Sequence, residues 1–323
     1  PDTVEPFCRG LAAPPAAPGK PVEGASVALD DIPRAIEDAG ASIVILAGGH
    51  EHQEAMAPAL ARLHFSGVPV VAAAEVWAWL EERLPLEALT PGLFLHQPGF
   101  GAVHWTLFNR VTRIVDVVAS LGLMVILSPV FLLALVAIRL FQGAPVFYRQ
   151  ERVGQYGRTF TLYKLRTMRR DAERDSGPTF AARADRRVTP VGAFLRRFRI
   201  DEMPQLWNIL KGEMSLVGPR PERPTFVAEL SEALPFYSFR LAVPPGLSGW
   251  AQVNHPYAAN LEDHRRKLEF DLYFIRERSM RLYLLTLLRT VSAMLVGART
   301  RPRKPSLSPS VEHRPVAPAR SSS

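Results

Sequence analysis

Hydrophobic residues are concentrated between residues 114 and 141, in a run with very few charges. This run, IVDVVASLGLMVILSPVFLLALVAIRLF, is about long enough to cross the apolar core of a bilayer. Ser128 and Pro129 interrupt it near the middle, and a proline kinks a helix because it removes a backbone donor. Arginines flank both ends, so charge sets no preferred orientation for a crossing. The pattern predicts a helix–break–helix hairpin that enters the membrane and returns to the cytoplasmic side; a kinked spanning helix is the alternative.

A second pattern lies upstream, over residues 29–95. Two short apolar runs, 41–48 and 68–74, have the character of strands, and residues between them repeat at helical spacing. A further helical pattern follows over 74–84. A strand–helix–strand–helix order is typical of a parallel βαβ unit. We therefore predict a partial Rossmann-like α/β domain in this region.

Downstream of the apolar run the pattern is mixed and more polar. Two segments joined at glycines, VFYRQERVG and RTFTLYKLRTM, predict a hairpin, and TPVGAFLRRFRI predicts an amphipathic helix with a basic face. The two ends of the chain differ from this. Residues 1–28 are rich in Pro, Ala and Gly, and residues 299–323 are rich in Pro, Ser and Arg. Because neither end has apolar periodicity, we expect a linker in the first and a disordered basic tail in the second.

Composition narrows the class of protein. The 323 residues include 39 Lys and Arg against 31 Asp and Glu, a formal net charge of +8. Such a charge suits partners that carry phosphate, although no DNA- or RNA-binding module is recognisable and nucleic acid is not expected. A single cysteine, Cys8, excludes an internal disulfide framework and a cysteine-built metal cluster. Because the first residue is Pro rather than Met, we expect part of the protein to precede it.

The strongest candidate chemistry lies in RIDEMPQLWNIL, over residues 199–210. Asp201 and Glu202 stand just before Pro204, and proline favours the first turn of a helix. The N–H groups and the positive dipole end at a helix N-terminus favour a phosphate and keep a carboxylate ionised. Adjacent carboxylates can divide the work, one as a nucleophile and one as a Mg²⁺ ligand. A capping Asp beside a surface Glu is the alternative.

Basic residues on both sides of this pair could complete a phosphate site. Arg220 follows a short apolar run and lies in a proline-stiffened turn, GPRPERP. Lys164 and Arg166 occupy alternate positions of YKLRTM, which would place them on one face of a strand. Arginine forks bind phosphate oxygens in bidentate geometry. These side chains could form a cationic pocket for a diphosphate, and solvated surface charge is the alternative for each.

With these motifs in order, residues 108–298 resemble the bacterial sugar transferase family, the monotopic polyprenyl-phosphate phosphoglycosyltransferases. The resemblance rests on the apolar hairpin with its Ser128–Pro129 break and on PVFYRQERVGQYGRTFTLYKLRTM, IDEMPQLWNILKGEMSLVGPRPE, VPPGLSGWAQVNHPY and KLEFDLYFI. It implies an α+β membrane-associated domain with a re-entrant helix–break–helix hairpin, here preceded by the partial Rossmann-like domain. Large exopolysaccharide-type members of the family also carry an N-terminal bundle of membrane helices, which we expect before residue 1.

The resemblance also implies an activity, the transfer of a phosphosugar from a nucleoside diphosphate sugar, of the UDP-sugar class, to polyprenyl phosphate. The product would initiate synthesis of an exopolysaccharide, a capsule or a related glycan. In this scheme Asp201 forms the covalent phosphosugar intermediate and Glu202 holds Mg²⁺. The basic positions of the family's motifs, which would contact phosphates, are matched here by Lys164, Arg166, Arg220 and Arg240.

The implied location is the inner membrane, with the catalytic domain facing the cytoplasm. The implied partners are the nucleoside diphosphate sugar, polyprenyl phosphate and the lipid bilayer. A homo-oligomer is a further alternative, because residues 29–95 could mediate association between copies of the chain. Two other classes of protein remain as alternatives. One is a catalytically inactive membrane scaffold, against which the intact acidic pair argues. The other is a basic protein that binds phosphate-bearing surfaces, which would leave the apolar hairpin unexplained.

Overall fold

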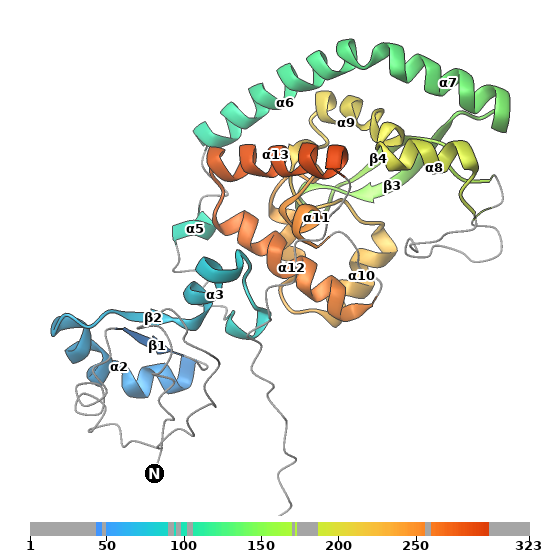
Figure 1. Ribbon diagram of the computed structural model, residues 1–323. Coiled ribbons are helices and arrows are strands. Elements are labelled where there is room, and N and C mark those ends of the chain that lie inside the picture. Colours follow the sequence, from blue (N-terminus) through green and yellow to red (C-terminus); the bar gives the residue numbers. More distant parts are fainter. Residues whose placement is uncertain are drawn as a thin grey trace, which may run out of the picture.

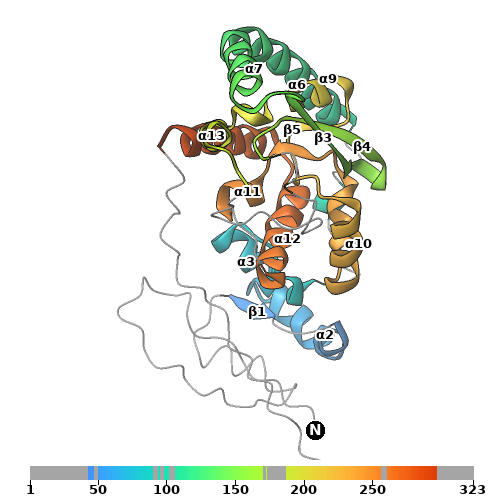
Figure 2. The same ribbon diagram turned by 90° about the vertical axis from the view of Figure 1, so that its right-hand side faces the viewer.

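In the computed structural model, a bent pair of long helices, α6 (Thr106–Ile126) and α7 (Ser128–Gln142), forms an arc along one side of the molecule (Figure 1). A small N-terminal unit lies at the opposite end, as the perpendicular view also shows (Figure 2). The expected linker over 1–28 and basic tail over 299–323 lie outside the described residues. The structure describes residues 43–46, 50–89, 94, 98–101, 106–169, 172, 187–255 and 260–296.

The N-terminal unit is a parallel strand–helix–strand arrangement, as the sequence predicts. Strand β1 (Val44–Leu46) pairs with β2 (Val70–Ala72), and helix α2 (His50–Phe65) connects them. Each strand is only three residues long, and the buried apolar residues of this unit are Val44 and Leu63. A fuller Rossmann-like domain therefore stays a prediction beyond this two-stranded unit.

The segment that follows β2 packs on the C-terminal part of the chain. It contains α3 (Ala73–Glu81) and a single 3-10 turn, η2 (Leu86–Ala88). Leu84 and Leu86 are buried in the main hydrophobic core, and the Leu84 backbone N–H donates to the Glu269 carbonyl oxygen over 3.1 Å. This segment therefore contributes to the core of the 108–298 region, which a division of the chain at residue 95 does not anticipate.

Helices α6 (Thr106–Ile126) and α7 (Ser128–Gln142) meet at the predicted break. Pro129 lies in the first turn of α7, where its missing N–H costs no helical hydrogen bond, and the Ser128 hydroxyl donates to the Val125 carbonyl oxygen over 2.8 Å. The bend is 61°, so the two helices form an open angle rather than an antiparallel hairpin. Within the described residues, no helix by itself has both the length and the apolar character to cross a membrane, whereas this pair has them jointly.

The outer side of this helix pair is apolar and exposed. Such a large apolar patch marks an interaction surface in a folded protein. On the inner side of α6, Asp116 accepts hydrogen bonds from the Tyr283 hydroxyl and, over 2.8 Å, from the Leu216 backbone N–H. The helix pair is therefore joined to the rest of the molecule by a buried polar contact. The apolar side chains of the pair that are more than half exposed are Leu107, Ile114, Val118, Leu121, Val125, Ile126, Leu132, Leu133, Val136, Leu140 and Phe141.

The region beneath the arc combines short strands with helices. Strands β3 (Phe147–Val153) and β4 (Thr159–Leu165) form the predicted antiparallel hairpin, and β5 (Ser215–Val217) pairs in parallel with β6 (Gly246–Ser248). Helix α12 (Leu261–Arg276) supplies much of the core. The remaining elements are α5 (Pro98–Gly101), η4 (Gln155–Gly157), α8 (Pro190–Arg197), η5 (Ile200–Glu202), α9 (Gln205–Lys211), α10 (Pro224–Ala233), η6 (Tyr237–Ala242), α11 (Trp250–Asn254) and α13 (Met280–Val296).

Candidate active site

The acidic pair lies in a short turn of its own rather than at the cap of a helix. Asp201 and Glu202 belong to the 3-10 turn η5, and Pro204 occupies the N-cap of the following helix, α9. Both carboxylates are buried, each residue being 7% exposed. The structure therefore does not support a capping Asp beside a surface Glu. It places two adjacent acids in the interior, where their charges need partners.

Turn η5 is held against the bent helix pair by apolar contacts. Ile200, the first residue of η5, packs in a cluster with Leu195 of α8 and with Ala134 and Ile138 of α7. Helix α8 starts close to the end of β4. A Cβ atom at Gly192 would lie only 2.0 Å from the Thr167 carbonyl oxygen, so the close approach of the two segments requires glycine there. The acids therefore lie directly beside α7, the second limb of the apolar pair.

Three cations surround Glu202. Its Oε1 atom accepts hydrogen bonds from Arg220 over 2.8 Å and from Lys164 over 3.5 Å. Its Oε2 atom accepts one from Arg199 over 3.2 Å. Arg196 also favours the ionised form of Asp201, so positive charges outnumber the two carboxylates of the pair. The structure thus brings together the predicted residues Asp201, Glu202, Lys164 and Arg220.

Arg199 is the member of this cluster that the sequence analysis did not assign. It stands three residues before Glu202, the spacing at which opposite charges meet on one helical turn, and this spacing was the available signal. Arg199 adopts a left-handed backbone conformation, with φ of 53°. That conformation turns the chain from α8 into η5 and points the guanidinium back to Glu202.

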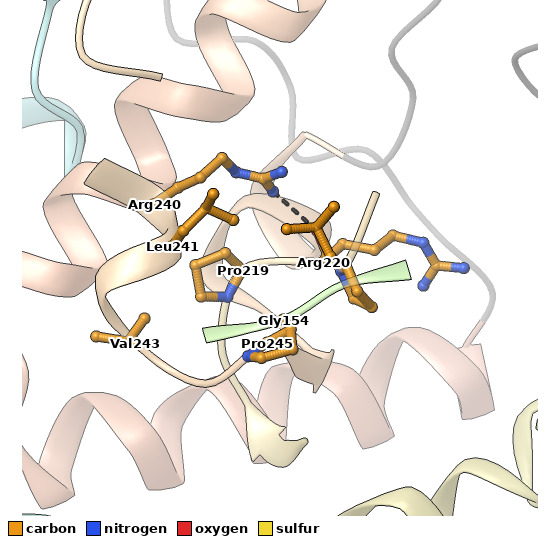
Figure 3. Close-up of a pocket in the computed structure, with 9 residues that line it drawn as sticks. Gly154, Pro219, Arg220, Arg240, Leu241, Val243 and Pro245 are labelled. Atoms are coloured by element: carbon orange, nitrogen blue, oxygen red, sulfur yellow. Dashed lines mark hydrogen bonds between the residues drawn. The ribbon is translucent and has the colours of Figure 1, made fainter. Parts of the chain in front are cut away.

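Arg220 is positioned by a tight backbone turn. Gly218 precedes it, and a Cβ at Gly218 would lie 2.3 Å from the Pro244 carbonyl oxygen. Arg240 donates to the Arg220 carbonyl oxygen over 3.0 Å, a contact drawn in Figure 3. The Arg220 guanidinium extends away from Arg240, toward Glu202 and the Gln252 side chain. A small pocket at this turn is lined by Val153, Gly154, Pro219, Arg220, Pro221, Arg240, Leu241, Val243 and Pro245 (Figure 3).

Two arginines that we predict to contact phosphate bind other protein groups in the structure. Arg240 is buried and pairs with the buried Asp271 over 2.8 Å, so it supports the turn that carries Arg220. Strand β4 ends at Leu165, so Arg166 lies just past it, where its guanidinium donates to the carbonyl oxygens of Gln142 and Gly143 at the end of α7. Neither guanidinium reaches the acidic pair through these contacts, and a phosphate contact for either one stays a prediction.

The electrostatics of the two acids differ. Burial raises the pKa of Asp201, the adjacent Glu202 charge raises it further, and Lys164 opposes both. Burial also disfavours the charge on Glu202, but Arg220, Lys164 and Arg199 together hold its pKa well below the usual range. Glu202 is therefore ionised at any physiological pH, whereas the Asp201 carboxylate is the more basic and hence the more nucleophilic of the two.

The cationic partner Lys164 is also perturbed. Burial lowers its pKa to about 8, although Glu202 favours the charged ammonium. The nearby Arg220 adds to the lowering because like charges repel. This lysine therefore carries its charge at neutral pH and loses it in mildly alkaline solution.

The acids fit one mode of magnesium binding. In the part of the chain that the structure describes, no three His, Cys, Asp or Glu side chains gather as a metal cage. Mg²⁺ commonly binds one or two carboxylates together with substrate phosphates and water. A permanently ionised Glu202 beside a second carboxylate matches that donor set, so the site suits an ion shared with a phosphate substrate and does not suit one held by protein alone.

These features define a class of protein that is equipped for phosphate chemistry next to an apolar surface. A buried carboxylate with a raised pKa, an ionised glutamate and surplus positive charge meet beside an exposed apolar helix pair. Residues 107–297 match the family described as bacterial sugar transferase. The chain belongs to this family.

Curated relatives share this region. Over 239 residues, 74% of this chain, it is 39% identical to a UDP-N-acetylgalactosamine-undecaprenyl-phosphate N-acetylgalactosaminephosphotransferase of Aeromonas hydrophila, of which 55% is covered. It is 47% identical over 134 residues, 42% of the chain, to a putative undecaprenyl-phosphate N-acetylgalactosaminyl 1-phosphate transferase of Bacillus subtilis, with 74% covered. It is 39% identical over 175 residues, 53% of the chain, to a UDP-glucose:undecaprenyl-phosphate glucose-1-phosphate transferase of Escherichia coli, with 38% covered. The chain thus spans about half the length of the Aeromonas relative.

Proposed function

We propose that this protein transfers a phosphosugar from a nucleoside diphosphate sugar, of the UDP-sugar class, to polyprenyl phosphate. The observation that carries the proposal is the buried pair Asp201 and Glu202, surrounded by Lys164, Arg199 and Arg220 and packed beside α7. The names of the relatives, which act with undecaprenyl phosphate, support the same reaction class. The lipid-linked product would initiate an exopolysaccharide, a capsule or a related glycan.

In the first half-reaction, a carboxylate oxygen of Asp201 attacks the β-phosphorus of the donor. The bond between that phosphorus and the oxygen bridging to the α-phosphate breaks, and the nucleoside monophosphate leaves with the bridging oxygen. Lys164 and Arg220 balance the charge of the diphosphate, which is the main demand of phosphoryl transfer. When bound, Mg²⁺ at Glu202 would neutralise further phosphate charge.

In the second half-reaction, a phosphate oxygen of polyprenyl phosphate attacks the same phosphorus. The bond from phosphorus to the Asp201 oxygen breaks, and the carboxylate is restored. The product is a polyprenyl diphosphate that carries the sugar. Because η5 packs on α7, Asp201 would lie close to the membrane surface, where an acceptor anchored by its isoprenoid chain would present its phosphate.

The bent helix pair suits a re-entrant position in the cytoplasmic membrane. With a 61° bend shared equally, each limb would lie about 30° from the membrane plane. A limb of 15 residues, about 22 Å long, would then descend about 11 Å. That is well short of the roughly 30 Å apolar core of a bilayer. Both basic ends of the pair would remain on one side, which we assign to the cytoplasm, together with the catalytic domain.

The test is to trap the covalent intermediate. The full chain, in lipid nanodiscs with Mg²⁺, is incubated with a panel of UDP-sugars and no acceptor, and intact-protein mass spectrometry records any added phosphosugar. We expect one donor to add a phosphosugar and to release UMP, and Asp201→Asn to do neither. Glu202→Gln should lower the rate and weaken the Mg²⁺ dependence, whereas Glu232→Gln, an exposed glutamate of α10, should behave as wild type. Turnover by the Asp201→Asn variant would refute the mechanism.

A further inference from the structure

Arg199 differs from the other two cations that hold Glu202. Its side chain is 41% exposed, against 20% for Lys164 and 30% for Arg220. Lys164 projects from β4 and Arg220 from the turn after β5, whereas Arg199 comes from the junction of α8 and η5. Arg199 is therefore the cation of this cluster that an approaching group reaches most readily.

The junction of α8 and η5 lies beside the apolar helix pair. Leu195 of α8 packs against Ala134 and Ile138 of α7, and Figure 1 shows α8 beneath α7. Phe194 and Phe198 lie on the outward side of this junction, 59% and 43% exposed, with ring centroids 5.0 Å apart. The exposed Phe198 ring is therefore adjacent in sequence to Arg199, and Phe194 lies beside it on the helix that packs against α7 through Leu195.

The charge balance of the cluster leaves Arg199 available for a second phosphate. Lys164 and Arg220 both donate to the Oε1 atom of Glu202, so this carboxylate keeps two cationic partners without Arg199. Arg199 binds the other oxygen, Oε2, through a single bond. An acceptor phosphate must come close to the phosphorus carried by Asp201, which is two residues from Arg199. A guanidinium exchanges readily between carboxylate and phosphate because its fork fits both.

Building on the proposed function, we propose that Arg199 binds the phosphate of the polyprenyl phosphate acceptor, with Phe194 and Phe198 contacting the start of its isoprenoid chain. In the second half-reaction the Arg199 guanidinium releases Glu202 and holds the attacking phosphate while the bond from phosphorus to Asp201 breaks. It accepts and donates no proton in this step, because a guanidinium stays charged in proteins. Arg199 is thus a residue of the acceptor site, separate from the donor contacts of Lys164 and Arg220.

The experiment measures the two half-reactions separately with the full chain in nanodiscs. Arg199→Ala should raise the KM for polyprenyl phosphate by about 10- to 100-fold, the range expected for one charge-assisted hydrogen bond. Formation of the Asp201 adduct without acceptor should slow by less than about threefold, since two cations still hold Glu202. Arg199→Lys should recover part of the acceptor affinity. The matched control is Arg62→Ala, an exposed arginine of α2 in the N-terminal unit, which should change the KM by less than about twofold.

Three results would overturn the assignment. An unchanged acceptor KM in Arg199→Ala is the first. Adduct formation that falls as much as acceptor affinity is the second, because Arg199 would then act through Glu202. The third comes from vesicles that contain anionic phospholipid: a loss of vesicle binding equal to the loss of acceptor affinity would assign Arg199 to bulk headgroups. Wild-type protein that forms no adduct would refute the proposed function itself, so the two failures are distinguishable.

Discussion

The pH dependence of the reaction tests the electrostatics of the site most directly. Burial and the adjacent Glu202 raise the pKa of Asp201 above its usual value of 3.8, and burial lowers the pKa of Lys164 to about 8. The nucleophile must be ionised and the lysine must be charged. The value of kcat/KM should therefore rise with pH as Asp201 loses its proton and fall above about pH 8 as Lys164 loses its own.

The size of the fall in kcat/KM at alkaline pH follows from the protonated fraction of Lys164. One pH unit above its pKa, about one tenth of the Lys164 side chains remain protonated, so kcat/KM should fall about tenfold for each further unit. Bound diphosphate stabilises the ammonium, so kcat should fall at a higher pH than kcat/KM does. In Lys164→Arg the guanidinium stays charged at every pH of the assay. The fall in kcat/KM at alkaline pH should therefore disappear, whereas the rise at acidic pH should remain.

The assay is UMP release over pH 5 to 10, at low and at saturating donor, for wild type and Lys164→Arg. Arginine is larger than lysine and will lower the absolute rate, so the shape of the profile is the readout. Lys211→Arg is the control, because that lysine is exposed and pairs with Glu213 away from the acidic pair. An alkaline fall that persists unchanged in Lys164→Arg would refute the assignment of this limb to Lys164.

Two further predictions concern a buried ion pair of the core and the position of the helix pair in the membrane. Arg83→Ala leaves the buried Glu269, 3% exposed, without its cation and should lower the free energy of unfolding by about 3–5 kcal/mol. Replacing both residues, Arg83→Met with Glu269→Leu, should recover most of that loss in denaturant titrations; a single variant within about 1 kcal/mol of wild type would contradict the reasoning. In a Cys8→Ser background, cysteines introduced at Leu107 and Phe141 should react with an impermeant reagent from the same side of sealed vesicles. Labelling from opposite sides would show that the pair spans the membrane.

Local patterns along the chain predicted several elements well. The helical spacing after the first strand corresponds to α2 (His50–Phe65), and the break at Ser128–Pro129 lies where the two limbs of the apolar pair meet. These features depend on neighbours within a few residues, through periodicity and through the backbone donor that proline lacks. The size of the bend at this break, 61°, did not follow from the pattern.

Contacts between distant residues were less predictable. Arg166 and Arg240 have the residue type of phosphate contacts, yet one caps the end of α7 and the other pairs with Asp271. Arg199 looked like an ordinary member of a basic helix face, yet its left-handed backbone directs it to Glu202. A guanidinium binds carbonyl, carboxylate and phosphate oxygens alike, so its residue type leaves its partner open.

The sequence by itself therefore determined the apolar helix pair and its break, the βαβ order, the β3–β4 hairpin and the presence of two adjacent acids. Only the tertiary structure decided that these acids are buried beside α7, that three cations meet on Glu202, and that the segment containing α3 and η2 completes the main core. The reason is physical. Periodicity and proline act over a few residues, whereas burial and charge pairing depend on which distant segments share the same space, and those distances shift the pKa values of Asp201 and Lys164.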